Sequence, residues 1–238
     1  MKKLAVCGGS WMTAISSHMP EHGTHFTELL ADHLQLEYIA LADLGQDNKT
    51  ICLQIEHGLE LGCDVFAIGI EKPQRVTLLS NAQLSNKKYM LQNIEYQHTQ
   101  SRSWKRKQKL GKAGYYFSMP IINITSPQHQ YINSDQKKYV KDYVKYQYSE
   151  KQMSRTDAWM LCYWLNKLQQ KNIKLMLFCD KGNPIKDLDE MQQFRSYMMP
   201  SNTPYEGYNP DIKSESYHTT QEYQKEAFQK VLKFYFSA

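Results

Sequence analysis

The stretch LAVCGGSW, Leu4 to Trp11, decides the fold and raises the functional question. Its four apolar residues predict a short buried strand. Gly8 and Gly9 predict a tight turn at the strand's end, because glycine adopts backbone conformations that a Cβ atom forbids. Ser10 follows at once, with its backbone N–H free to donate. It is either a turn residue or a nucleophile held at a strand end.

Outward from this stretch, the first 70 residues alternate between strand and helix patterns. The expected strands are 4–7, 36–41 and 65–68; the expected helices run from a Thr24 cap to Leu34 and from an Asp47 or Asn48 cap to Gly62. This order predicts an α/β fold, a flavodoxin-like parallel sheet with helices on both faces in three layers. In such sheets, ligands bind at the carboxyl ends of the strands, where the strand order reverses.

The same pattern returns near the C-terminus. A helix is expected from Ser154, and a buried strand at 173–179 that ends at Asp180. A last helix is expected from Thr219 or Thr220 to Tyr235. The apolar faces of the Ser154 helix are expected to be Trp159, Cys162, Tyr163, Leu165 and Leu168.

Residues 72–152 interrupt the alternation. The window 86–150 holds 12 Lys or Arg against 4 Asp or Glu, a net of +8, and 9 of the 17 tyrosines. We expect residues 1–238 to form a single domain with a basic, Tyr-rich insertion at about 72–152, helical around 136–148. We favour a solvated charge run on a surface loop. Contacts of its Lys, Arg and aromatic residues with nucleic acid or an anionic glycan are the alternative.

Composition narrows the class of protein. The net charge of +5 does not by itself indicate a nucleic-acid partner. The five cysteines are an odd number without a CxxC pair, so we expect free, buried thiols, no metal site and a reducing compartment. The apolar run after Lys3 is too short for a signal peptide, and no stretch is long enough to span a membrane. These features predict a cytoplasmic location, with release by lysis or virion association left open.

A nucleophilic serine needs a base, a group that orients the base, and donors for the oxyanion. His218 lies just before the last expected helix, and Glu215 precedes it by three residues. Such a histidine is well placed to face a strand-end site, although loop histidines are usually surface residues. Three others, His18, His22 and His25, could border a pocket.

These residues resemble a family. A first strand ending in G-[DG]-S, a glycine after the second strand, a third strand ending in glycine and a late acid-x-x-H are similar to the SGNH, or GDSL-type, hydrolases. In particular, the chain resembles the compact members encoded by bacteriophages, through LADLGQDN at 41–48. The resemblance covers 3–76 well and 154–236 in outline.

The resemblance implies a role for each matching residue. Ser10 would be the nucleophile and first oxyanion donor, Gly45 the second donor, His218 the base and Glu215 the acid. No cofactor or metal is implied.

Three positions depart from the family pattern. Gly9 replaces an aspartate, Glu71 stands where the family has an asparagine donor, and Glu215 replaces an aspartate. Asn48 could supply the missing amide. Arg75 could pair with Glu71 or with an anionic substrate group.

Two functions follow. The first is a carboxylic-ester hydrolase, an esterase or deacetylase that forms a covalent acyl-enzyme, with an acylated saccharide among the candidate substrates. The second is a catalytically weak or inactive protein of the same fold that binds a ligand or serves a structural role, such as in a virion. A phosphate loop is disfavoured, because neither glycine-rich phosphate motif follows Gly8.

Overall fold

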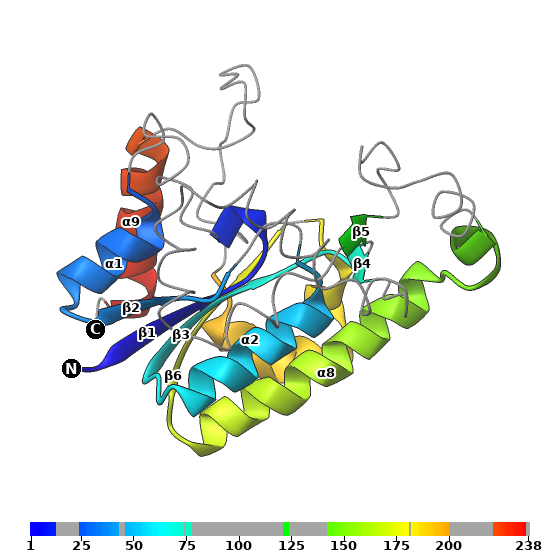
Figure 1. The fold of residues 1–238 in the computed structure, drawn as a ribbon, viewed down its shortest axis with the longest axis horizontal. Helices are drawn as coiled ribbons and strands as arrows, with labels where there is room; N and C mark the ends of the chain where they lie inside the picture. The colour runs from blue at the N-terminus through cyan, green and yellow to red at the C-terminus, as the bar shows by residue number, and fades with distance from the viewer. Residues whose placement is uncertain are drawn as a thin grey trace, which may run out of the picture.

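The computed structural model describes residues 1–12, 24–42, 46–73, 75–77, 121–123, 142–180, 182–199 and 221–236. Within them, a four-stranded parallel sheet forms the centre of the molecule (Figure 1). Its strands are β1 (Lys3–Cys7), β2 (Glu37–Ala40), β3 (Val65–Ile70) and β6 (Lys174–Cys179). The order is β2-β1-β3-β6, so the chain moves outward from β1 to β2 and then returns to the other side of β1. The strand predictions are confirmed.

One face of the sheet is covered by α1 (Phe26–His33) and α9 (Gln221–Phe236). Leu4 and Val6 of β1 share a core cluster with Leu30 of α1 and Val231 of α9. Successive strand residues point to opposite faces, so these two β1 residues mark one side of the sheet.

The other face is covered by α2 (Asn48–Glu60) and α8 (Glu150–Gln170). Ala5 and Cys7, the alternate residues of β1, pack there with Ile55 of α2 and Leu161 of α8. The three-layer arrangement is therefore confirmed for the described residues. Each layer is held by apolar side chains that are almost completely removed from water.

The remaining described elements are short. Strands β4 (Arg75–Thr77) and β5 (Ile121–Asn123) pair antiparallel in a separate two-stranded sheet. Residues 142–146 are helical, within the range where helix was expected. Two 3-10 segments, η4 (Pro184–Asp187) and η5 (Asp189–Tyr197), follow β6.

Two helix starts differ from the sequence prediction. Helix α1 is capped by His25 instead of Thr24. Helix α8 begins at Glu150 with Ser149 as its cap, four residues before Ser154. The Ser154 hydroxyl donates to Glu150 O at 2.7 Å, which is a bond made inside a helix and not at its start.

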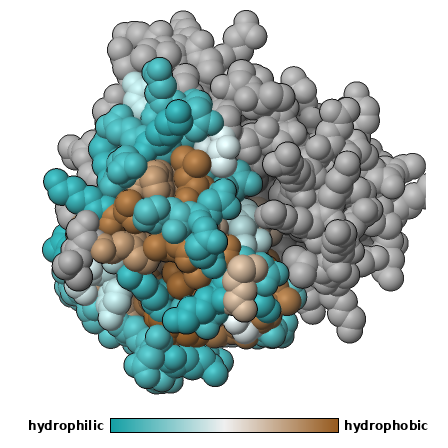
Figure 2. Space-filling model, turned by 90° about the vertical axis from the view of Figure 1, so that its left-hand side faces the viewer, coloured by the Kyte–Doolittle hydropathy of each residue, from teal (hydrophilic) through white to brown (hydrophobic). Residues whose placement is uncertain are grey.

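The apolar faces of α8 were also predicted wrongly in part. Trp159 and Tyr163 are 59% and 55% exposed, because the helix turns Leu161, Leu165 and Leu168 toward the core. Figure 2 looks onto another side of the molecule, the side of α1 and α9. Hydrophobic surface gathers there between hydrophilic rims, and Leu34, Leu36, Phe228 and Leu232 pack partly buried against the core below.

Candidate functional site

A 3-10 turn, η1 (Ser10–Met12), follows β1 at the carboxyl edge of the sheet; we call it the Ser10 turn. Gly8 has φ +149°, a conformation that glycine adopts readily. Its N–H donates to Gln54 Oε1 at 2.6 Å, and Gln54 is fully buried on α2. The turn is closed by Met12 N–H donating to Gly9 O at 3.0 Å. The backbone of Ser10 is therefore fixed at the end of a central strand.

The Ser10 turn packs directly on β3. A Cβ atom added to Gly69 would collide with Met12 Cγ and would lie 2.7 Å from Trp11 Cζ2. One added to Gly8 would lie 2.6 Å from Met12 Cγ. Both glycines are therefore required by the close approach of Met12, which is itself fully buried. The turn and the end of β3 are therefore closely packed against each other.

Cys7 is the other nucleophilic side chain beside this turn. It is fully buried, and burial raises the pKa of its thiol well above the ordinary value. A thiol that stays protonated is a poor nucleophile. All five cysteines are free and buried, as predicted.

The N-terminal end of α1 connects the Ser10 turn with the first turn of α9. His25 caps α1, and its Nε2 lies 3.1 Å from Trp11 O. Thr24 N–H donates to Gln221 Oε1 at 2.6 Å, and Phe26 N–H donates to Gln224 Oε1 at 2.8 Å. The start of α9 therefore lies beside the start of α1, at the same edge of the sheet as Ser10.

A buried polar cluster occupies the same edge between α2 and α8. Asn48 Nδ2 donates to Glu71 O and to Asp157 Oδ2, both at 2.8 Å, and Asn48 Oδ1 accepts from Glu71 N–H at 3.0 Å. Asn48 is fully buried, and Glu71 and Asp157 are 4% and 3% exposed. One amide group thus joins the start of α2, the end of β3 and the middle of α8.

Asp157 has an unusual protonation behaviour. The pKa of its carboxyl group is raised to about 7: burial raises it most, the hydrogen bond from Asn48 lowers it, and the charges of Asp47 and Lys49 raise and lower it by smaller amounts. Asp47 is the buried cap of α2 and accepts from both Thr50 N–H and Thr50 Oγ1. With Asp47, Glu71 and Asp157, three carboxyl groups are therefore buried at this edge.

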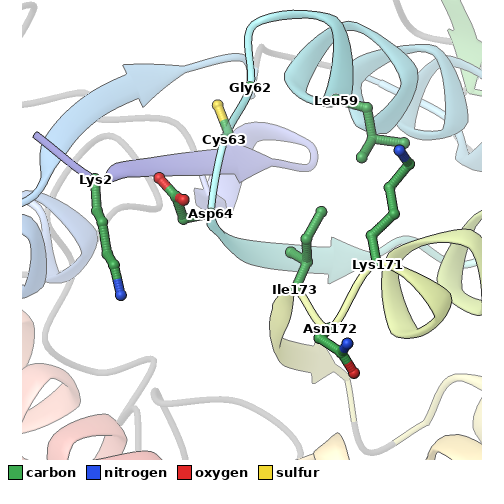
Figure 3. Close-up of a pocket in the computed structure, with 8 residues that line it drawn as sticks. All are labelled: Lys2, Leu59, Gly62, Cys63, Asp64, Lys171, Asn172 and Ile173. Carbon is green, nitrogen blue, oxygen red and sulfur yellow. The ribbon is translucent and has the colours of Figure 1, made fainter.

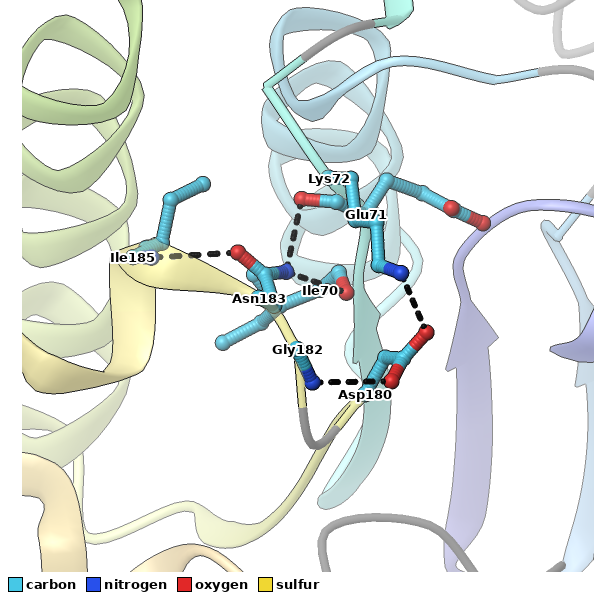
Figure 4. Close-up of polar contacts among 7 residues, drawn as sticks. All are labelled: Ile70, Glu71, Lys72, Asp180, Gly182, Asn183 and Ile185. Atoms are coloured by element: carbon cyan, nitrogen blue, oxygen red, sulfur yellow. Dashed lines mark hydrogen bonds and ion pairs between the residues drawn. The ribbon is translucent and has the colours of Figure 1, made fainter. Parts of the chain in front are cut away.

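The ends of β3 and β6 are joined by polar contacts (Figure 4). Asn183 Nδ2 lies 2.9 Å from Glu71 O and 3.2 Å from Ile70 O. Lys72 Nζ lies 2.9 Å from Asp180 Oδ2. Burial alone would raise the pKa of Asp180, but Lys72 and the Gly182 N–H bring it below its ordinary value. The Glu71 side chain extends away from these contacts, on the side of β1.

The structure brings together part of the predicted site. Ser10, Asn48 and Glu71 all belong to segments at the carboxyl edge of the sheet. Arg75 begins β4, and only its backbone is described. Gly45, Glu215 and His218 lie outside the described residues, as does most of the basic segment 72–152.

Sequence reasoning gave His25 only a place at the border of a pocket, and it gave Asp157 no role at this edge. The Asp157 carboxyl contacts a residue 109 positions away, which no local pattern reveals. The position of His25, just before the apolar period of α1, is a signal for a cap, although Ser, Thr, Asp and Asn are the usual caps.

A pocket opens at the opposite, amino edge of the sheet, between Lys2, Asp64 and Lys171 (Figure 3). The Asp64 carboxylate accepts from Lys3 N–H at 2.9 Å and so helps to hold the start of β1. This pocket is separated from the Ser10 turn by the length of the strands.

Comparisons of the chain with family models, curated proteins and solved structures returned no match. Among the described residues, no group of three or more His, Cys, Asp or Glu side chains is arranged to hold a metal ion. None of the described helices is both long enough and apolar enough to cross a membrane.

Proposed function

We propose that the protein is a serine hydrolase of the SGNH type that cleaves a carboxylic ester. One observation carries the proposal: residues at the start of α1 form hydrogen bonds both to the Ser10 turn and to the first turn of α9. His218 precedes Gln221 by three residues in the sequence. Three residues of chain span at most about 10 Å. The proposal requires that, within this span from Gln221, His218 reaches the Ser10 hydroxyl.

The proposed reaction has two steps. His218 accepts the Ser10 proton while Ser10 Oγ attacks the ester carbonyl, and Glu215 orients the imidazole. The N–H groups of Ser10 and Gly45 stabilise the oxyanion. The alcohol leaves with the proton from His218, and water then hydrolyses the acyl-enzyme by the same route. The proposal assigns no cofactor, and an acylated saccharide is its candidate substrate.

The sheet order supports this assignment. The order β2-β1-β3-β6 puts the reversal point between β1 and β3, whose carboxyl ends carry Ser10 and Glu71. This is the place where parallel α/β sheets bind ligands. The free, buried cysteines support a reducing, cytoplasmic location within the same proposal.

A second candidate is a protein of this fold that binds a ligand without turning it over. The observation that favours it is the orientation of Asn48, which donates both amide protons inward, to Glu71 O and Asp157. An oxyanion role for Asn48 would require one of these bonds to break. Losing one oxyanion donor costs roughly 10²–10³ in rate.

Hydrolysis of p-nitrophenyl acetate by the wild type, Ser10→Ala and His218→Ala separates the two candidates. The hydrolase proposal expects wild-type turnover that falls at least about 10³-fold in both variants. Equal background rates in all three proteins would favour the binding protein.

A further inference from the structure

Three consecutive residues at the start of α1 each make a hydrogen bond to the Ser10 turn or to the first turn of α9. Thr24 N–H bonds Gln221 Oε1, His25 Nε2 bonds Trp11 O, and Phe26 N–H bonds Gln224 Oε1. His25 and Gln224 are 4% and 6% exposed, so water competes little for these bonds. The first N–H groups of a helix lack partners within the helix, which leaves Phe26 N–H available for α9.

The ring of His25 is fixed from both sides. A backbone carbonyl only accepts, so Nε2 carries the proton and donates to Trp11 O. In the neutral ring, Nδ1 then accepts from Thr27 Oγ1 at 2.6 Å and from Thr27 N–H at 3.4 Å. Thr27 Oγ1 in turn accepts from Tyr38 Oη at 3.1 Å. This chain of donors sets one tautomer and one ring orientation.

We propose that His25 and Gln224 are positioning residues that together fix the Ser10 turn relative to the first turn of α9. The inference rests on the proposed function, because that function places the nucleophile in the Ser10 turn and the base just before α9. His25 acts through Trp11, the neighbour of Ser10, and Gln224 acts through the helix that follows His218. Near 1 Å of misplacement between reacting groups costs roughly 10²-fold in rate.

Two substitutions of His25 separate positioning from helix capping. His25→Asn keeps a good cap but is too short to reach Trp11 O. His25→Gln places an amide nitrogen about as far from Cβ as Nε2, so it reaches Trp11 O but caps poorly. We expect His25→Asn to keep the melting temperature and lose about 10-fold or more in kcat with little change in KM. His25→Gln should lower the melting temperature and keep kcat within about 3-fold.

The α9 side is tested by Gln224→Met and Gln224→Glu. Methionine removes the acceptor for Phe26 N–H, whereas glutamate keeps it. Gln224→Met should therefore lower kcat and speed hydrogen exchange of the Phe26 amide, and Gln224→Glu should change both much less. Exchange of the Met12 amide, which bonds Gly9 O, should accelerate in His25→Asn and not in His25→Gln.

The exchange rates separate failure of this inference from failure of the proposed function. An inactive wild type would overturn the hydrolase proposal. Faster exchange of the Met12 amide in His25→Asn and of the Phe26 amide in Gln224→Met would still support the positioning role of His25 and Gln224. The positioning role alone would be overturned if the wild type is active but amide exchange is unchanged in the variants. It would also be overturned if kcat follows the melting temperature across the His25 variants.

Discussion

At the scale of single residues, Asp157 is the most informative, because its carboxyl group is buried between α2 and α8 and has a pKa of about 7. In the unfolded chain an aspartate ionises near pH 4. Between these values the folded protein binds the proton and the unfolded chain does not, so stability falls as pH rises from about 4 to 7. One such group contributes at most about 1.4 kcal/mol per pH unit.

Asp157→Asn should remove this pH dependence and stabilise the protein at pH 7.5, because the amide needs no ionisation and its oxygen still accepts from Asn48. Urea unfolding at pH 5 and 7.5 measures both effects. Asp142→Asn, at an exposed position, makes the same chemical change without touching the buried carboxyl and should leave the slope in place. An unchanged slope in Asp157→Asn would show that another group titrates.

Gly69 gives a second prediction at this scale. Gly69→Ala puts a Cβ atom against Met12 and Trp11, and overpacking of this kind costs roughly 1–3 kcal/mol. We also expect it to displace the Ser10 turn and to lower esterase activity. Gly182→Ala is the control, since the nearest atom to its new Cβ among the described residues is Lys72 Nζ, at an ordinary contact distance of 3.7 Å. Equal loss of stability in both variants, measured by urea unfolding, would contradict this packing.

At the scale of elements, the Tyr235 side chain of α9 contacts the outer strand β6 at Leu177, whose carbonyl also accepts from Met199 N–H at 3.2 Å. Tyr235 Oη accepts from Leu177 N–H at 3.1 Å and lies 2.9 Å from Leu177 O and 2.7 Å from Tyr197 O. Tyr235→Phe should destabilise the protein by roughly 1–3 kcal/mol, because Leu177 N–H loses its acceptor. Hydrogen exchange at Leu177 should accelerate as well, and Tyr146→Phe, at an exposed position, serves as the control. Slow exchange at Leu177 in Tyr235→Phe would mean that another group accepts this proton.

The helices show where sequence patterns reach their limit. The strands were predictable because each is a short, mainly apolar run that alternates along the chain with a helix-like stretch. The start of α8 was not, because both Ser149 and Ser154 carry a capping hydroxyl and only the fold decides which one is used. Trp159 and Tyr163 are apolar enough for a core, yet the opposite side of α8 holds the leucines that the sheet covers.

At the scale of the whole molecule, the parallel order β2-β1-β3-β6 explains why residues far apart in sequence meet at one edge. The strand-end positions of Ser10 and Glu71 were predictable from this alternation alone. The hydrogen bonds from Asn48 to Asp157 and between α1 and α9 could not be predicted from the sequence, because each joins segments over 100 residues apart. These long-range polar contacts hold the proposed site together.

Covalent labelling tests whether Ser10 is an activated nucleophile. The protein is treated with a fluorophosphonate, and its intact mass and labelled peptide are measured. We expect one adduct, on Ser10, that is absent from Ser10→Ala and forms far more slowly in His218→Ala. No adduct, or an adduct on another residue, would contradict this expectation.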